Sequence, residues 1–305
     1  MFKLDELSGV LVAMASPLDE DGSVDEAGVE RLVEHVLSGG VHGLLPLGST
    51  GESASLDETA RRKILARTVK AAAGRVPVIC GVAQSHLTAA QDEVEAAARL
   101  EADAVLVAPP FYYPADQATV LEFYRRLAGR NPLPIFLYNI PQFTKVVAEP
   151  ATVATLAREG TIAGIKDSSR DFEYFESVLI ATRDLPRFRV FTGSDTMLFA
   201  SLAVGGAGTI CGAANIAPHW VVRIFDDFQR EDYSGARAAQ DELHLLVTAL
   251  RAGMFPAAIK AALHAQGICG PWPAPPAKTL DERLTAQLKA SLEACGLLAT
   301  RGSPD

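Results

Sequence analysis

Short apolar runs and longer stretches of helical period alternate eight times along this chain. The runs are continuously apolar and rich in β-branched residues, which is typical of parallel strands covered on both faces. They span residues 10–13, 43–47, 76–80, 104–107, 134–137, 162–165, 189–191 and 208–211. The helical stretches span residues 25–38, 57–73, 88–101, 115–129, 149–158, 171–183, 195–204 and 217–230. Eight strand–helix units in a row predict an α/β protein of the (β/α)8, or TIM, barrel class.

The rest of the chain predicts a helical extension to this barrel. Three amphipathic stretches follow residue 230, at 234–251, 254–265 and 281–297. We therefore expect a catalytic barrel domain over residues 1–230 and a three-helix C-terminal extension over residues 231–305. A doubly wound open sheet is the alternative, but no GxGxxG motif follows the first strand, where a dinucleotide-binding sheet would carry it.

Composition narrows the range of partners. The chain has 49% hydrophobic and 21% charged residues, and its net charge is −9. An acidic chain without a basic run is predicted to bind neither nucleic acid nor an anionic membrane. No apolar run approaches the ~20 residues of a membrane-spanning helix, and the first residues lack the order of a signal peptide. We therefore expect a cytoplasmic protein whose four scattered cysteines are free thiols.

One lysine stands where a barrel of this class places its chemistry, at the C-terminal end of a strand. Lys166 follows the apolar run Ile162–Ile165, and side-chain alternation puts it on the same face as Gly164. Partial burial disfavours the charged form of an amine, and a neutral amine forms a Schiff base with a ketone. The alternative is a lysine that pairs with Asp167.

Two further strand ends carry polar groups beside this lysine. Tyr138 ends the neighbouring strand, and a phenol can donate and accept protons. The alternative is a rim tyrosine with its hydroxyl in water. The loop Gly48–Glu52 offers successive N–H groups and the hydroxyls of Ser49 and Thr50, which together suit a carboxylate. We interpret Glu52 as a first-turn carboxylate at a helix N-terminus.

Metal chemistry has no signal in the sequence. The six histidines show no ligand spacing, and no cluster of acidic residues accompanies them. We therefore expect no metal and no separate cofactor. The glycine-rich stretch 205–212 lies where barrels often bind phosphate, but we favour close packing or contact with sugar hydroxyls as its role.

Four motifs occur in an order and at a spacing that resemble one enzyme family. They are Gly48-Ser49-Thr50-Gly51-Glu52, Pro110-Phe111-Tyr112-Tyr113-Pro114, Tyr138-Asn139-Ile140-Pro141 and Gly164-Ile165-Lys166-Asp167. The chain resembles the pyruvate-dependent, Schiff-base-forming aldolases, the family that includes dihydrodipicolinate synthase and N-acetylneuraminate lyase. The resemblance covers essentially the whole chain and implies a TIM barrel with a helical extension, assembled as a tetramer of two dimers.

The resemblance also implies roles for individual residues. Lys166 matches the Schiff-base lysine, and Tyr138 matches the phenol above the imine. Ser49 matches the hydroxyl that links to this phenol, and Gly48, Ser49 and Thr50 match the carboxylate-binding loop. Tyr112 matches a tyrosine that the neighbouring subunit lends to complete the proton relay. The backbone around Ile210 matches the segment that flanks the bound keto acid.

Departures from the family pattern bear on the substrate. Dihydrodipicolinate synthases carry an arginine that holds the carboxylate of aspartate semialdehyde, and Phe143 takes its place. N-acetylneuraminate lyases pair an aspartate with a glutamate to bind the sugar hydroxyls. Asp195 is present in this chain, but Thr196 replaces the glutamate. The aromatic run and Lys166–Ser169 are closest to enzymes acting on 2-keto-3-deoxy sugar acids.

These residues predict a metal-free class I lyase. The expected reaction is reversible cleavage of a 2-keto-3-deoxy sugar acid, such as 2-keto-3-deoxygluconate, to pyruvate and an aldehyde. The alternatives within the family are dihydrodipicolinate synthase, a keto-deoxy sugar acid dehydratase and N-acetylneuraminate lyase. A non-catalytic barrel that binds keto acids is the alternative from a different class.

Overall fold

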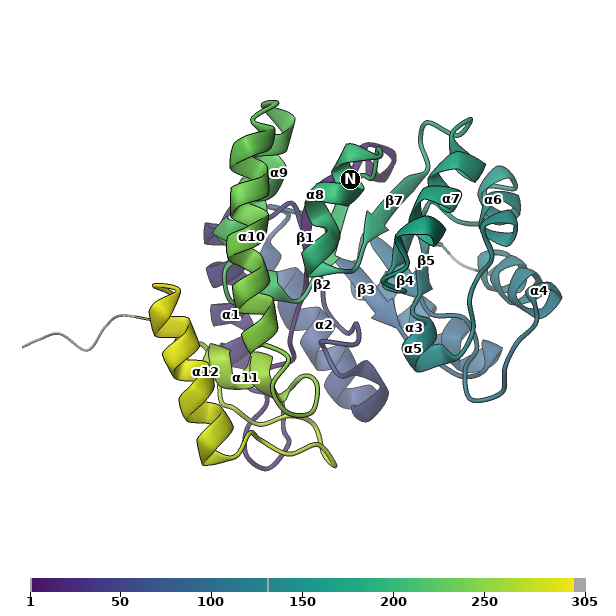
Figure 1. Ribbon diagram of the computed structural model, residues 1–305. Coiled ribbons are helices and arrows are strands. Elements are labelled where there is room, and N and C mark those ends of the chain that lie inside the picture. Colours follow the sequence, from purple (N-terminus) through teal and green to yellow (C-terminus); the bar gives the residue numbers. More distant parts are fainter. Residues whose placement is uncertain (1, 131, 299–305) are drawn as a thin grey trace, which may run out of the picture.

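Eight parallel strands form a barrel at the centre of the molecule (Figure 1). The computed structural model describes residues 2–130 and 132–298. The strands are β1 (Gly9–Ala13), β2 (Gly43–Leu45), β3 (Ile79–Val82), β4 (Ala104–Val107), β5 (Ile135–Asn139), β6 (Gly164–Asp167), β7 (Arg189–Thr192) and β8 (Gly208–Cys211). They pair in the order β2-β1-β8-β7-β6-β5-β4-β3. A parallel bridge between Leu44 and Val78 joins the two ends of this order. The predicted TIM barrel is confirmed.

Helices connect successive strands and cover the outside of the barrel. They are α1 (Glu26–Ser38), α2 (Glu58–Ala72), α3 (Leu87–Arg99), α4 (Gln117–Ala128), α6 (Pro150–Arg158), α7 (Phe172–Thr182), α8 (Leu198–Ala203) and α9 (Pro218–Gln229). A short helix, α5 (Pro141–Thr144), follows β5 directly. Aspartates start many of these helices: Asp57, for example, accepts a hydrogen bond from the N–H of Ala60. Such a cap stabilises a helix by about 1 kcal/mol.

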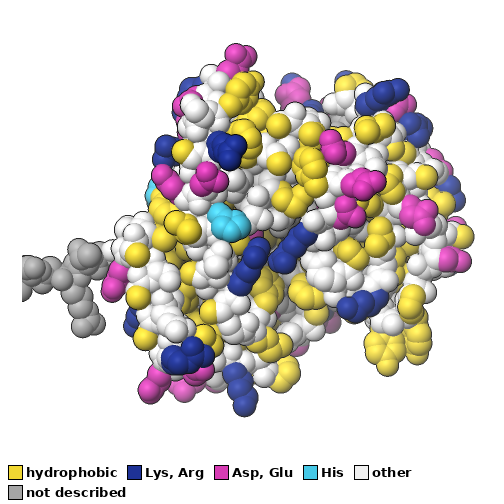
Figure 2. Space-filling model, in the orientation of Figure 1, with side chains coloured by type: hydrophobic (Ala, Val, Ile, Leu, Met, Phe, Trp, Pro, Cys, Tyr) yellow, Lys and Arg dark blue, Asp and Glu magenta, His cyan; other side chains and the backbone are white. Residues whose placement is uncertain are grey.

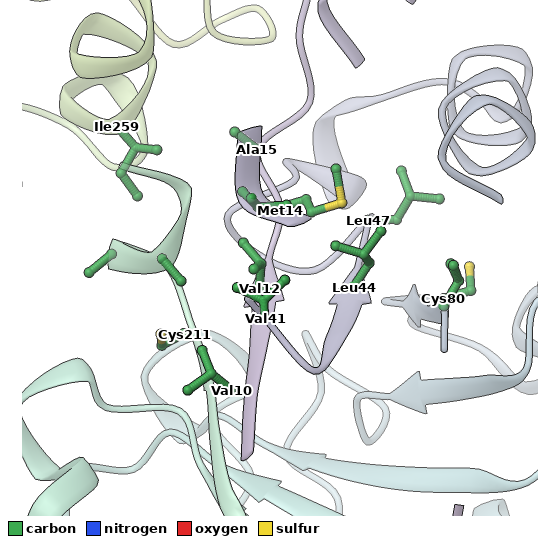
Figure 3. Close-up of a cluster of buried hydrophobic side chains, with 14 of the residues drawn as sticks. Val10, Val12, Met14, Ala15, Val41, Leu44, Leu47, Cys80, Cys211 and Ile259 are labelled. Carbon is green, nitrogen blue, oxygen red and sulfur yellow. The ribbon is translucent and has the colours of Figure 1, made fainter. Parts of the chain in front are cut away.

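Alternation of side chains along the strands builds two apolar layers. Leu11 and Phe136 point into the barrel, where they belong to the inner buried cluster. Val10 and Val12 point outward into a larger buried cluster beneath the helices, and Figure 3 shows them beside Leu44 of β2. Strands buried on both faces have to be apolar throughout, which explains the continuous runs in the sequence.

The C-terminal helices α10 (Tyr233–Ala249), α11 (Ala257–Ala265) and α12 (Glu282–Ala294) lie against one side of the barrel. Helix α10 packs along α9, and α11 and α12 contact each other (Figure 1). Ile259 of α11 belongs to the same buried cluster as the outer face of β1 (Figure 3). The three helices were expected from the sequence, and the division at residues 230 and 231 stays a prediction.

Strands β3 and β6 are shifted most from their predicted bounds. We expected strands at residues 76–80 and 162–165, whereas β3 covers Ile79–Val82 and β6 covers Gly164–Asp167. The ladder of β6 begins where Gly164 pairs with Phe136, so strand pairing and not the apolar run decides the start. As a consequence Lys166 lies inside β6 rather than after it.

The surface and the thiols complete the description. Basic and acidic side chains are interspersed over the face shown in Figure 2. Cys80, Cys211 and Cys269 are free and buried, and Cys295 is free and half-buried, as the sequence predicted. Burial raises the pKa of the Cys80 thiol to about 12. No helix in the described part of the chain is long and apolar enough to cross a membrane.

Close packing of two glycines joins β1 to β8 and gives a first prediction. A Cβ on Gly208, which has φ +143°, would lie 1.9 Å from the carbonyl oxygen of Gly9. We therefore expect Gly208→Ala to lower the free energy of unfolding by about 3 kcal/mol or more. Gly160 has φ +70° but open space around it, so Gly160→Ala should cost only about 1 kcal/mol. Urea unfolding of both variants measures this; equal losses would contradict the packing account.

Candidate active site

Lys166 points into the barrel from β6 and is buried, with 3% of its surface exposed. Its side chain needs space, and Gly193 at the end of β7 supplies it. A Cβ on Gly193 would lie 1.9 Å from Oγ of Ser168 and 2.9 Å from Cε of Lys166, so this glycine makes room for both side chains. Gly164, by contrast, leaves room for Phe136, whose ring would lie 2.6 Å from an added Cβ. Gly193, directly after the neighbouring strand β7, therefore leaves space for the Lys166 side chain.

The contact that the structure gives to the Lys166 amine is an aromatic ring. Its Nζ lies 4.4 Å from the centroid of the Tyr138 ring, because Tyr138 and Lys166 are register partners on adjacent strands. Within the described residues, no carboxylate lies in ion-pair distance of this amine. The amine therefore lies beside a phenol, a group that can take and return protons during Schiff-base chemistry.

The alternative pairing of Lys166 with Asp167 is wrong. Successive side chains of a strand point to opposite faces, so Asp167 leaves the barrel interior. Its carboxylate accepts hydrogen bonds from Nδ2 of Asn139, at 2.8 Å, and from Oγ of Ser169, at 2.9 Å. Burial raises the pKa of Asp167, and the hydrogen bond from Asn139 acts in the opposite direction.

The phenol of Tyr138 reaches the loop that follows β2. Its hydroxyl lies 3.3 Å from Oγ of Ser49, within hydrogen-bond distance. This excludes the alternative in which the Tyr138 hydroxyl is free in water, since the side chain is only 6% exposed. The structure thus brings Lys166 of β6, Tyr138 of β5 and Ser49 of the loop after β2 into one chain of contacts.

The loop itself is held in an unusual conformation. Leu47 and Glu52 have positive φ angles of 63° and 56°, which cost energy for residues other than glycine. A Cβ on Gly51 would lie 2.8 Å from the N atom of Leu47, so the loop folds tightly on itself. Oγ of Ser16 donates a hydrogen bond to the carbonyl of Gly51, at 2.7 Å, and fixes the loop to the end of β1.

The other predicted carboxylate-binding residues lie around the same mouth. Thr50 is buried, and an added Cβ on Gly212, beyond β8, would lie 3.5 Å from its Oγ1. Gly48 belongs to the loop and lines the cavity described below. Ile210 is fully buried in β8 and belongs to the inner cluster of the barrel. That these residues hold a keto acid stays a prediction.

A buried ion pair at this loop was missed by the sequence analysis. The carboxylate of Glu52 lies 2.9 Å from Nζ of Lys260 in α11, and both side chains are buried. Glu52 also accepts a hydrogen bond from the N–H of Ala274, and Lys260 donates to the carbonyls of Ser16 and Trp272. Our interpretation of Glu52 as a first-turn helix carboxylate is therefore wrong, since it joins the loop to the extension.

The remaining predicted residues lie away from the amine. Tyr112 is 81% exposed, in the loop before α4, with φ +81° and its ring against Tyr113. It does not line the cavity of its own chain, and its proposed role across a dimer stays a prediction. The carboxylate of Asp195 accepts a hydrogen bond from the N–H of Ala213, at 2.7 Å. Phe143 lies in α5 and is 57% exposed.

A cavity of about 360 Å³ opens at this end of the barrel. Ser49 and Tyr138 line its inner part, and Phe143, Met254 and Phe255 line its outer part. Lys166 is not part of the lining but lies directly against the Tyr138 ring. In the described part of the chain, no three His, Cys, Asp or Glu side chains are placed to hold a metal ion.

The barrel, the buried Lys166 and the similarity to known lyases together identify the class of protein. The chain is a pyruvate-dependent carbon–carbon lyase of class I. The chain belongs to the dihydrodipicolinate synthetase family, whose model matches residues 6–295.

Two curated relatives show the breadth of this family. An uncharacterised DapA-like lyase of Halobacterium salinarum is 36% identical over 96% of this chain and 95% of the relative. A 4-hydroxy-tetrahydrodipicolinate synthase of Hyphomonas neptunium is also 36% identical, over 95% of this chain and 98% of the relative. The chain is equally similar to an uncharacterised lyase and to a synthase of this family.

Solved structures agree with the fold. Dihydrodipicolinate synthase of Thermotoga maritima matches with a TM-score of 0.93 and 30% identity, over 96% of this chain and all of that one. YagE of E. coli K12, solved in complex with pyruvate, matches with a TM-score of 0.92 and 29% identity, over 95% and 99%. A structure described as a monomeric dihydrodipicolinate synthase variant has a TM-score of 0.94 and 29% identity, over 98% and 100%.

The Glu52–Lys260 pair gives a prediction for stability. Lys260→Met leaves a buried carboxylate without its counter-ion and should lower the free energy of unfolding by about 3–5 kcal/mol. The double variant Glu52→Gln with Lys260→Met removes the charge but keeps an acceptor for the N–H of Ala274, so it should lose less. Chemical unfolding of the two variants tests this. A double variant less stable than Lys260→Met would contradict the ion-pair account.

Proposed function

We propose that this protein is a Schiff-base lyase in which Lys166 is the nucleophile. It cleaves a 4-hydroxy-2-keto acid reversibly to pyruvate and an aldehyde. The observation that carries the proposal is the placement of the Lys166 amine, 4.4 Å from the Tyr138 ring and without a carboxylate partner among the described residues. The link from Tyr138 to Ser49 supplies a route for protons.

The reaction follows from these groups. The Lys166 amine attacks the C2 ketone, water leaves, and a protonated imine forms. Tyr138 takes the proton of the C4 hydroxyl while the C3–C4 bond breaks and its electrons pass to the imine nitrogen. The aldehyde departs, C3 of the resulting enamine is protonated, and water releases pyruvate from the lysine. The Ser49–Thr50 loop would hold the substrate carboxylate, so part of the rate comes from orientation.

The sequence predicts a 2-keto-3-deoxy sugar acid, such as 2-keto-3-deoxygluconate, as the substrate of this reaction. Support for this substrate comes from the motif resemblance, above all from the aromatic run before α4 and from residues 166–169. A dihydrodipicolinate synthase reaction is less well supported, because Phe143 stands where a cation would hold the second carboxylate. In the described residues the single charged side chain of the cavity lining is Glu52, which Lys260 neutralises.

The proposal also covers the oligomeric state and the cellular location of the protein. We propose a homotetramer of two dimers in the cytoplasm, in which each subunit lends Tyr112 to its neighbour. The exposure of Tyr112 and Tyr113 on a loop that leads into α4 supports this contact. Light scattering and the activity of Tyr112→Phe test this assembly, since one structural neighbour is described as a monomeric variant.

Removal of the nucleophile is the direct functional test. Lys166→Ala should lower pyruvate release at least about a thousandfold, because no imine can form, and its far-UV circular dichroism should match the wild type. Lys289→Ala, which removes an exposed lysine of α12, is the matched control and should keep full activity. Substantial turnover by Lys166→Ala would remove this lysine from the mechanism.

The phenol is tested separately. Tyr138→Phe removes the proton carrier but keeps the ring against Lys166, so we expect kcat to fall about 10²- to 10⁴-fold. Slow imine formation should still be seen by borohydride trapping. The measurement is steady-state pyruvate release with trapping of the same samples. Unchanged kcat would show that protons move by another route.

A further inference from the structure

The outer wall of the catalytic cavity is formed by exposed apolar side chains. Phe143 of α5, Met254 and Phe255 are 57%, 66% and 47% exposed, and all three line this cavity. The two rings lie 6.4 Å apart with their planes at 40°. Phe143 lies in α5, which follows β5, whereas Met254 and Phe255 lie in the loop before α11. Exposed apolar side chains that lie next to one another are a common feature of ligand-binding grooves.

The hydroxyls of the cavity lining belong to the loop after β2, on Ser49, Ser53 and Ser55, and to Tyr138 and Thr144, whereas Phe143, Met254 and Phe255 add apolar surface at the mouth. The charged side chain in the described lining, Glu52, is neutralised by Lys260. The hydroxyl of Thr144 donates to the carbonyl of Ile140, at 3.1 Å. A sugar fragment with several hydroxyls would lose hydrogen bonds to water here without gaining equivalent partners, which costs binding energy.

The apolar wall lies where the aldehyde half of the substrate, the part beyond C4, would bind. If the carboxylate lies at the Ser49–Thr50 loop and C2 at Lys166, the chain beyond C4 has to leave towards the mouth. Phe143 lies five residues after Tyr138, on the helix that directly follows β5. The group attached to C4 therefore meets Phe143 and Phe255. The hydroxyls of Ser168, Ser194 and Thr196 do not line this cavity.

Resting on the proposed lyase function, we propose that the aldehyde half of the substrate is aromatic, in place of the sugar fragment that the sequence predicts. The preferred substrate is a 4-aryl-4-hydroxy-2-keto acid, which yields pyruvate and an aryl aldehyde. The C3–C4 bond breaks, the C4 hydroxyl proton passes to Tyr138, and the bonding electrons pass to the imine nitrogen. The aryl ring of the substrate packs against Phe143 and Phe255, because aromatic rings favour tilted or edge contacts with one another. Met254 is flexible enough to cover it.

The test compares two substrates and two kinds of variant. Pyruvate release is measured with 4-hydroxy-2-oxo-4-phenylbutanoate and with 2-keto-3-deoxygluconate, and kcat/KM is determined for each. We expect the wild type to prefer the phenyl compound at least about tenfold. Phe143→Gln and Phe255→Gln should each lower kcat/KM for the phenyl compound about tenfold and narrow the preference. Ile180→Gln, a change at an exposed apolar residue of α7 outside this cavity, should alter neither value.

The possible results distinguish a failure of the aromatic proposal from a failure of the proposed lyase function. Equal or better turnover of 2-keto-3-deoxygluconate would overturn the aromatic proposal and leave the lyase intact. A pyruvate adduct on Lys166 without cleavage of either compound would also overturn it. No pyruvate adduct on the folded wild type would defeat the proposed lyase function itself. Loss of both activities in equal proportion in Phe143→Gln and in Phe143→Leu would show that the wall does not discriminate between the substrates.

Discussion

The placement of one amine inside an otherwise apolar barrel is the constraint on which the rest of the site depends. Burial of a charged group is unfavourable unless a partner compensates it. The structure gives Lys166 an aromatic face rather than a carboxylate, and sends Asp167 to the opposite side of β6. This arrangement places the amine beside a phenol that can exchange protons with it or with a bound substrate. Gly193 supplies the space that the side chain needs.

The loop after β2 shows how a strained segment is kept in place. Leu47 and Glu52 adopt positive φ angles, and such strain persists where the surroundings fix it. Ser16 holds the loop from the end of β1, and Lys260 holds it from the C-terminal extension. The extension is thus tied to the same loop that presents Ser49 to Tyr138. This connection explains how helices outside the barrel contribute to the geometry at its mouth.

Much of the fold and part of the site could be predicted from the sequence. Eight apolar runs with helical spacers specify the barrel, and strand alternation places Lys166 and Tyr138 on the inner face. Strand bounds were less accurate, because the start of β6 depends on pairing with β5 rather than on its own apolar residues. The contacts between Glu52 and Lys260 could not be predicted, since nothing local distinguishes a buried lysine in α11 from an exposed one.

The apolar outer wall of the cavity could not be predicted from the sequence. The Phe143–Phe255 wall combines residues far apart in the sequence, and only the folded chain brings them together. The exposure of Tyr112 fits a partner across a dimer but is a property of one subunit.

The most direct test of the central claim is borohydride trapping of the folded protein with pyruvate, read by intact mass and peptide mapping. The account predicts one pyruvate-sized adduct, located on Lys166 and lost in Lys166→Ala. An adduct on another lysine, or none, would contradict it.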